Sequence, residues 1–205
     1  IKSVVSTSLC ERICDAYGVC CVETLTGFKF IGEKIKEYEA SGEHSFIFGF
    51  EESIGYLAGT YTRDKDAVLA AMLLAEMACY FRSKGESVYE GLLALYDKYG
   101  YCEEFNSSVR YDGYEAASRI SASMLALRNN LPTELGYPVE KVRDFSKGVD
   151  GFPATDMLNF YLTEDCEVLI RPSGTEPIVK IYVKSSDSTA DKARIKAEKV
   201  MTATK

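Results

Sequence analysis

The first half of the chain alternates between short apolar runs and amphipathic segments. The run KSVVS predicts a strand, and the apolar residues of LCERICDAYG recur at helical spacing until Gly18. Ser8 and Glu11 have the spacing of a capping box at the start of that helix. The run VCCVETL, an amphipathic helix from Phe28 and the run FIFG follow. This order of strand, helix, strand, helix and strand is typical of a parallel α/β sheet.

The middle of the chain predicts three more helices and then a break. Residues 67–81 are apolar on almost every side, which predicts a buried helix. Ser87 and Glu90 form a second capping box before a helix that ends at Gly100. A run with strand-like alternation at 101–111 precedes a helix near 115–128. The segment NNLPTELGYP then holds two prolines, a glycine and two asparagines, which predicts a domain boundary near residue 130.

The remainder predicts a different kind of unit. Four strands, near 139–145, 157–162, 167–170 and 179–183, precede a final helix at 189–201. Ser188 and Asp191 are the expected capping pair of that helix, whose alanine-rich face should cover one side of the sheet. The fold class is therefore α/β, with a mixed α/β domain at 1–130. A small α+β domain with an antiparallel sheet and a C-terminal helix follows at 131–205.

Composition and charge narrow the function classes. The chain is 46% hydrophobic and 27% charged, which is typical of a soluble globular protein. A formal charge of -7 argues against a nucleic-acid partner, because phosphate backbones are bound by surplus Lys and Arg. No apolar run reaches the roughly 20 residues of a membrane span. A cytoplasmic location is expected, and the start at IKSVVS, without methionine, suggests a fragment of a longer protein.

Cysteine usage predicts buried thiols in a reducing compartment. The chain holds seven cysteines, most of them in apolar segments: Cys10, Cys14, Cys20, Cys21, Cys79, Cys102 and Cys166. Cys10 and Cys14 would share a helix face, but no Cys-x-x-Cys spacing occurs, so no metal site is predicted. His44 lies in a polar stretch and is expected at the surface.

The heptapeptide RPSGTEP, at 171–177, has the chemistry of an anion-binding loop. Arg171 offers a planar fork of donors, Ser173 and Thr175 offer hydroxyls, and Gly174 lets a ligand approach the backbone. A tight polar hairpin with Arg171 paired to Glu176 fits the same residues, so the pattern leaves both open.

Three further segments could contact a ligand. GFEESIGY follows an apolar strand, where open α/β sheets bind ligands, and its carboxylates suit sugar hydroxyls, although adjacent glutamates also occur in solvated turns. TGFKF begins a helix and places Lys29 in the first turn, where anions are favoured. RDKD precedes the apolar helix, and its charges could simply cap that helix.

The ordered set TGFKF, GFEESIGY, RDKD and RPSGTEP resembles the C-terminal half of the α-D-phosphohexomutases, in the phosphoglucomutase/phosphomannomutase branch. The resemblance covers essentially the whole chain and implies the third and fourth of four domains. It implies that Glu51 and Ser53 bind sugar hydroxyls, that Thr26 and Gly27 belong to a loop that closes on the substrate, and that Phe28 stands where relatives have Trp or His. Lys65 matches a lysine considered a proton acceptor, and Phe50 replaces a glycine.

For residues 131–205, the expected fourth domain of the family, the resemblance implies a phosphate-binding set that holds the phosphate not being transferred: Arg171, Ser173, Gly174 and Thr175. The serine that carries the transferable phosphate and the DGDGDR-type loop that binds Mg2+ belong to the family's first and second domains. No segment here resembles either, so the chain supplies no metal ligands and should not turn over alone. The implied partners are a sugar phosphate and the missing N-terminal domains.

The implied reaction moves phosphate reversibly between C1 and C6 of a hexose. It proceeds through a bisphosphorylated sugar, with Mg2+ and an activator of the glucose 1,6-bisphosphate type. Alternatives are a phosphopentomutase-like enzyme, which tends to have Ala where Ser53 stands, and a non-catalytic sugar-phosphate-binding module. The choice between glucose and mannose stays open.

Overall fold

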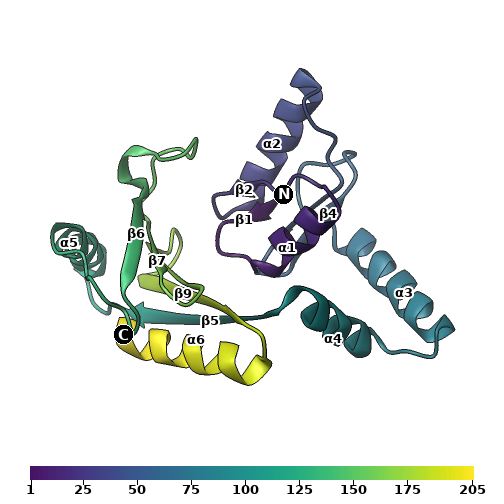
Figure 1. The fold of residues 1–205 in the computed structure, drawn as a ribbon. Helices are drawn as coiled ribbons and strands as arrows, with labels where there is room; N and C mark the ends of the chain where they lie inside the picture. The colour runs from purple at the N-terminus through teal and green to yellow at the C-terminus, as the bar shows by residue number, and fades with distance from the viewer. The chain divides into compact units, whose positions relative to one another are not determined.

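The computed structural model describes residues 1–205 as two compact units, Ile1–Tyr99 and Gly100–Lys205. The two units, shown in Figure 1, are described separately below. No helix in either unit is long and apolar enough to cross a membrane. The predicted mixed α/β class is confirmed.

The first unit is built on a four-stranded mixed sheet in the order β2-β1-β3-β4. Strand β1 pairs in parallel with β2 and β3, and β4 returns antiparallel to β3. The buried side chains Phe28, Ile31, Ile35 and Leu57 form the core between α2 and the sheet. The elements in chain order are β1 (Lys2–Ser3), α1 (Leu9–Ala16), β2 (Glu23–Thr24), α2 (Phe28–Ser41), β3 (Phe48–Glu51), β4 (Gly55–Ala58), α3 (Ala67–Ser83) and α4 (Val88–Tyr99).

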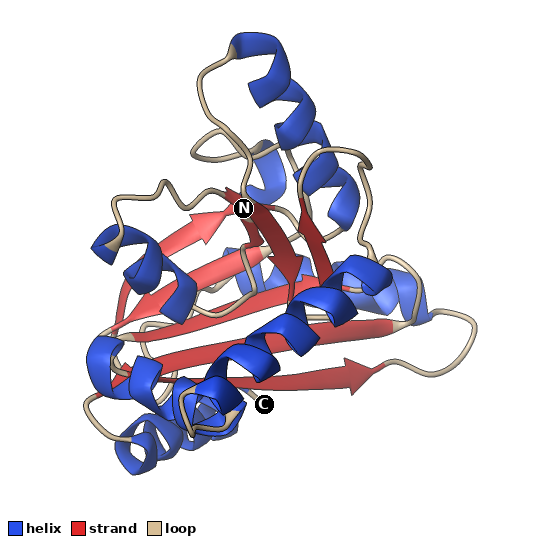
Figure 2. Ribbon diagram, turned by 90° about the vertical axis from the view of Figure 1, so that its right-hand side faces the viewer, coloured by secondary structure: helices blue, strands red, loops and turns tan.

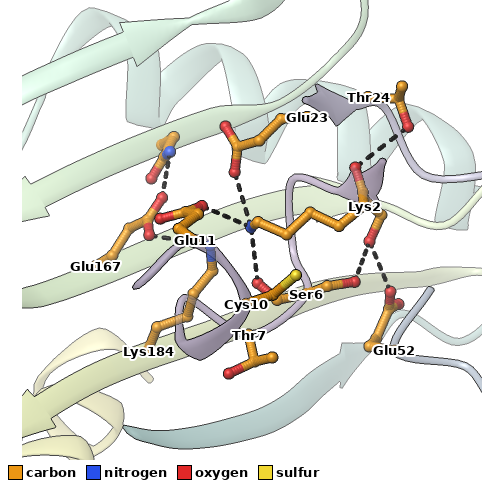
Figure 3. A network of polar contacts seen from close by, with 12 residues as sticks. Lys2, Ser6, Thr7, Cys10, Glu11, Glu23, Thr24, Glu52, Glu167 and Lys184 are labelled. Carbon is orange, nitrogen blue, oxygen red and sulfur yellow. Dashed lines mark hydrogen bonds and ion pairs between the residues drawn. The ribbon is translucent and has the colours of Figure 1, made fainter. Parts of the chain in front are cut away.

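A lysine with no solvent exposure lies at the centre of this unit. Lys2 Nζ is 2.9 Å from a Glu11 carboxylate oxygen and 3.0 Å from one of Glu23, and it donates to the Ser6 carbonyl at 3.2 Å (Figure 3). Burial alone would lower the pKa of Lys2, but the charges of Glu23 and Glu11 outweigh it and raise that pKa. The ion pairs therefore tie α1 and β2 to the central strand.

The first predicted capping box does not form. Ser8 makes no side-chain capping bond to α1, because its backbone is helical (φ -75°, ψ -14°) where an N-cap residue is normally extended, and the Glu11 carboxylate pairs with Lys2. The second capping box does form. The Ser87 backbone N-H donates to the Glu90 carboxylate at 2.6 Å, and the Glu90 N-H donates to Ser87 Oγ at 3.1 Å, at the start of α4.

The prediction that residues 67–81 form a buried helix is right in its secondary structure and wrong in its burial. Helix α3 forms, but none of its residues is buried. Val68 is 82% exposed and Met72 is 56% exposed. The helix packs against β4 and α4, which together cover too little of its circumference to bury a side chain. An apolar composition does not specify which neighbour will cover a helix.

The second unit is a five-stranded antiparallel sheet in the order β5-β9-β8-β7-β6. Figure 2 shows the long strands side by side, and α6 runs along β5 and β9. The elements are β5 (Tyr101–Arg110), α5 (Ala116–Asn129), β6 (Val139–Asp144), a short 3-10 helix (Phe145–Lys147), β7 (Leu158–Leu162), β8 (Cys166–Pro172), β9 (Ile178–Asp187) and α6 (Ala190–Thr204).

One face of this sheet forms the core of the second unit. Alternate residues of β7, β8 and β9 meet side chains of α5 and α6, including Met124 and Val200, in one buried cluster. The α6 helix is capped by Thr189, whose hydroxyl accepts from the Lys192 N-H at 3.4 Å, one residue after the predicted Ser188. The predicted antiparallel sheet and C-terminal helix are confirmed.

The compact units divide between Tyr99 and Gly100 rather than near residue 130. The physical reason is β5, which pairs with β9 from Tyr101↔Asp187 to Arg110↔Ile178. Because β5 pairs with β9 along its whole length, it belongs to the second unit, although the segment rich in proline and glycine comes later in the sequence. The assignment of 1–130 and 131–205 to two family domains stays a prediction.

Replacing Lys2 with methionine should lower the free energy of unfolding by about 1–3 kcal/mol, because Glu11 and Glu23 would keep their charges without a partner. Urea denaturation followed by circular dichroism measures this, since the chain holds no tryptophan. The control is Lys34→Met, which removes a solvent-exposed pair with Glu37 and should change stability by less than about 0.5 kcal/mol. Equal midpoints for both variants would show that the buried ion pairs do not stabilise the unit.

Candidate functional site

The segment GFEESIGY at 49–56, called the sugar loop below, is joined by one hydrogen bond to the loop of Thr26 and Gly27 that is predicted to close on the substrate. The Gly27 backbone N-H donates to Glu51 Oε1 at 2.5 Å. Glu51 ends β3 and is 7% exposed, and Gly27 precedes the first turn of α2 with φ at +117°. Only glycine adopts that backbone conformation without strain. The acidic side chain therefore lies at the start of α2, where the helix dipole favours a negative charge.

Three predicted residues from three segments surround Gly55. A Cβ atom at Gly55 would lie 3.1 Å from the Lys65 side chain, 3.4 Å from the Phe28 ring and 3.6 Å from Glu51 Oε2. Lys65 Nζ lies 5.9 Å from the centroid of the Phe28 ring. The structure thus packs the side chains of a carboxylate, an ammonium and an aromatic residue around one buried glycine, whose lack of a side chain lets the three come together.

The RDKD segment is held against the sheet and against α2. The Asp66 N-H donates to the Tyr56 carbonyl of β4 at 2.8 Å, and the Asp66 side chain caps α3. Gly32 of α2 allows close approach, since a Cβ there would lie 2.5 Å from the Arg63 carbonyl oxygen. Lys65 itself is exposed and pairs with Asp64 at 3.1 Å. The segment therefore both caps α3, through Asp66, and fixes the position of Lys65.

The tip of the sugar loop is strained. Ile54, which is 81% exposed, has φ at 62°, a conformation that β-branched residues rarely adopt. Its neighbour Ser53 is exposed, and Glu52 accepts a hydrogen bond from Ser3 Oγ at 3.0 Å. The tip thus presents Ser53 to solvent, while its base is fixed by Glu51 and Glu52. Strain of this kind is common at ligand-binding loops.

The RPSGTEP segment forms the connection between β8 and β9. The Ser173 N-H donates to the Ile178 carbonyl at 2.9 Å, and the Tyr111 N-H donates to the Pro177 carbonyl at 2.9 Å. Gly174 is exposed, with no atom within 4 Å of the place where a Cβ would stand. Ligand atoms could therefore approach the backbone there.

Arg171 is partly buried at the base of this hairpin. Its guanidinium donates to the Tyr182 hydroxyl at 3.3 Å and to the Pro172 carbonyl at 3.5 Å, rather than to Glu176. Its Nε is buried without a hydrogen-bond partner. Lys180 stands opposite Arg171 across the β8–β9 pair, so two positive charges lie side by side. An unused donor and adjacent positive charges both favour an anion.

The hairpin also forms one wall of a cavity of about 380 Å3, whose other wall is α5. Its lining includes Ser173, Gly174 and Thr175 of the hairpin and Ser121 of α5, but not Arg171. The structure thus brings three of the four predicted phosphate-binding residues to one cavity and leaves Arg171 beside it. The sugar-loop residues lie in the first unit and the hairpin in the second.

The residues of this site do not fit a magnesium ion. Mg2+ requires several oxygen ligands in octahedral geometry. Glu51 and Glu52 are adjacent in sequence, but each already accepts a hydrogen bond from a different partner, Gly27 and Ser3. The one close group of metal-ligating side chains in the structure consists of thiols, which Mg2+ does not prefer.

Sequence reasoning missed several residues of these sites. Ile54 and Gly55 follow the predicted Ser53, and the glycine was the available signal that side chains from other segments approach closely there. Ser121 and Asp156 line the hairpin cavity, but nothing in their local sequence marks them. They come from α5 and from the loop before β7, so packing alone brings them to the hairpin.

Comparison with known proteins identifies both parts of the chain. Residues 1–99 match the family model described as phosphoglucomutase/phosphomannomutase, alpha/beta/alpha domain III. Residues 137–200 match the model described as phosphoglucomutase/phosphomannomutase, C-terminal domain.

Similar curated proteins carry the same name. A phosphoglucomutase of Staphylococcus epidermidis is 32% identical over 197 residues, which cover 90% of this chain and 36% of that protein. One from Staphylococcus aureus is 31% identical over 195 residues, covering 89% of this chain and 35% of that protein. The chain therefore spans about a third of the length of these relatives.

Solved structures share the fold. The open form of Paramecium parafusin, titled a phosphoglucomutase, matches with a TM-score of 0.69 at 16% identity, covering 98% of this chain and 36% of that chain. A phosphoglucomutase/phosphomannomutase family protein of Burkholderia thailandensis matches with a TM-score of 0.60 at 15% identity, with the same coverage of 98% and 36%.

Replacing Gly27 with alanine should destabilise the first unit by about 1–3 kcal/mol, because a side chain strains a backbone with φ at +117°. Urea denaturation measures the change. Gly174→Ala is the matched control, since open space surrounds that glycine, and it should alter stability by less than about 0.5 kcal/mol. If the two variants unfold at the same urea concentration, Gly27 does not hold a conformation that requires glycine.

Proposed function

The chain belongs to the phosphoglucomutase/phosphomannomutase family, of which it carries domain III and the C-terminal domain, and we propose that it recognises the sugar phosphate of such an enzyme. The observation that carries this proposal is the convergence of Glu51, Lys65 and Phe28 around Gly55. Three motifs separated in sequence meet there, as a single ligand would require.

The first unit would bind the sugar. Glu51 Oε2 lies near Gly55, and a carboxylate can accept hydrogen bonds from sugar hydroxyls. Ser53 would contribute a hydroxyl from the exposed tip, and Phe28 would offer an apolar ring face. Thr26 and Gly27 would position this loop over the substrate. Lys65, which is exposed, is our candidate for moving a proton to or from a sugar hydroxyl.

The second unit would hold the phosphate that is not transferred. Ser173, Gly174 and Thr175 line an open cavity and offer hydroxyl and backbone donors. Arg171 would complete the set by turning its guanidinium from Tyr182, to which it is bonded at 3.3 Å, toward the phosphate. A weakly held guanidinium with an unused Nε can make that change at small cost.

The reaction of the full enzyme would be reversible transfer of phosphate between C1 and C6 of a hexose through a bisphosphorylated sugar. Either end of the sugar must then meet the same phosphate loop, which needs donors that are permissive in geometry. Hydroxyl and backbone donors on an exposed hairpin meet that need. The name phosphoglucomutase on the curated relatives favours glucose phosphates over mannose phosphates as the substrate to test first.

The magnesium ion and the phosphorylated serine of the full enzyme would lie outside these 205 residues. Mg2+ would stabilise the negative charge that develops during phosphoryl transfer. A bisphosphate activator would supply the phosphate that the serine first carries. The residues described here would orient the sugar and retain its second phosphate. We place the full enzyme in the cytoplasm, where sugar phosphates are made and used.

The phosphate loop can be tested on this chain alone. Glucose 1-phosphate binding, measured by calorimetry, should weaken by about 10–100-fold in Arg171→Ala, the loss expected for charge-assisted hydrogen bonds. Arg194→Ala, an exposed arginine paired with Glu198 on α6, is the control and should bind as the wild type does. Unchanged affinity in Arg171→Ala would remove Arg171 from the phosphate site.

The sugar loop is best tested in the full-length protein that contains these residues. Glu51→Gln keeps an acceptor for the Gly27 N-H but removes the charge, so kcat/KM for glucose 1-phosphate should fall at least about tenfold. Glu33→Gln changes an exposed glutamate of α2 and should leave kcat/KM unchanged. A wild-type protein that binds the sugar phosphate without converting it would instead be a non-catalytic binding module.

A further inference from the structure

Three thiols that lie apart in sequence meet in the first unit. The sulfur atoms of Cys10, Cys14 and Cys21 all lie within 4.8 Å of one another, and those of Cys10 and Cys14 are 3.9 Å apart. Each of the three residues is partly buried, and none is in a disulfide. The cluster has no part in the sugar or phosphate recognition proposed above.

The spacing fits a metal ion without large movement. A tetrahedral centre with metal–sulfur bonds of about 2.3 Å places its sulfurs roughly 3.8 Å apart. Cys10 and Cys14 already meet that spacing, because residues four apart face the same side of a helix. Cys21 lies within 1 Å of it, at no more than 4.8 Å from either sulfur. A shift of that size needs only a change in its side-chain torsion.

The backbone holds the cluster together before any metal arrives. Cys10 and Cys14 lie on α1, and the chain turns back on its own helix where the Val19 N-H donates to the Cys14 carbonyl at 2.9 Å. The position of Cys21 is fixed by its neighbour Val22, whose carbonyl accepts a hydrogen bond from the Lys2 N-H at 2.9 Å. All three ligands are therefore preorganised, which reduces the entropy lost on binding.

Figure 3 shows Cys10 beside the buried Lys2 network. Metal binding would displace the thiol protons of the three cysteines.

An open position remains for a fourth ligand. The three cysteines line a pocket of about 440 Å3, and Cys20 and His44 line the same pocket. Cys20 and His44 are both exposed, so either side chain could turn toward the ion, or water could fill the position. Three thiolates with an accessible fourth position are a donor set for soft and borderline cations, and not for Mg2+.

We propose that Cys10, Cys14 and Cys21 form a binding site for a thiophilic d10 metal ion of the Zn2+ class. A bound ion would link α1 to the segment that enters β2. The same pocket is lined by Phe50, the residue before Glu51 on β3, so the ion would also lie behind the strand that carries the sugar loop.

The test is a titration of the fully reduced chain with Zn2+ by calorimetry and with Cd2+ by ultraviolet absorption. Cd2+ serves as the probe because its thiolate bonds absorb where unligated Cd2+ does not. We expect one ion per chain, a thiolate absorption band, and no competition from excess Mg2+. Cys10→Ser and Cys21→Ser should each weaken Zn2+ binding by at least about 100-fold, because loss of an outer-shell partner alone costs about 10–100-fold.

The matched control is Cys79→Ser, which changes an exposed thiol of α3 in the same unit and should bind Zn2+ as the wild type does. Circular dichroism of each variant establishes that it is folded, and Cys14→Ser replaces any variant that is not. Absence of binding by the reduced wild type, or equal affinity in the ligand variants and the wild type, would overturn the proposal. Equal losses in Cys79→Ser and the ligand variants would overturn it too.

Discussion

The first unit depends on one buried ammonium group. Lys2 lies on the central strand of the sheet and has no exposed surface, yet it is charged, so the unit must supply carboxylates around it. Glu11 and Glu23 meet this requirement from α1 and β2. Their positions set the path of the chain on both sides of the cysteine cluster. The strand that carries Glu51 pairs with β1, so the sugar loop rests on the same arrangement.

The two proposed recognition loops differ in how firmly their central side chains are held. Glu51 is held rigidly by a glycine whose backbone no other residue adopts easily, so its orientation is fixed before a ligand binds. Arg171 has weak hydrogen bonds and an unused donor, so it can respond to a ligand. These properties fit the roles proposed for the two side chains, Glu51 as an acceptor for sugar hydroxyls and Arg171 as a donor to a phosphate.

The sequence predicts the strands and helices well and their environments less well. Ser87 and Glu90 form the expected capping box, whereas Ser8 and Glu11, with the same spacing, do not, because the Ser8 backbone is helical and the Glu11 carboxylate pairs with Lys2. Local spacing contains no information on a charge that arrives from another strand. The same limit applies to α3, whose composition does not determine what covers it. It also applies to the cysteines, because the spacing in the sequence does not predict that the turn after α1 brings Cys21 to Cys10 and Cys14.

The place of β5 in the sheet has a consequence for how the second unit folds. Its partner β9 is the last strand of this sheet along the chain, and the pairing runs from Tyr101↔Asp187 to Arg110↔Ile178. The first strand of the sheet to be synthesised therefore pairs with the last. Closure over so many residues is slow, and during translation β5 has to wait unpaired. Until β9 leaves the ribosome, ten residues with strand-like alternation are open to pairing with the wrong chain.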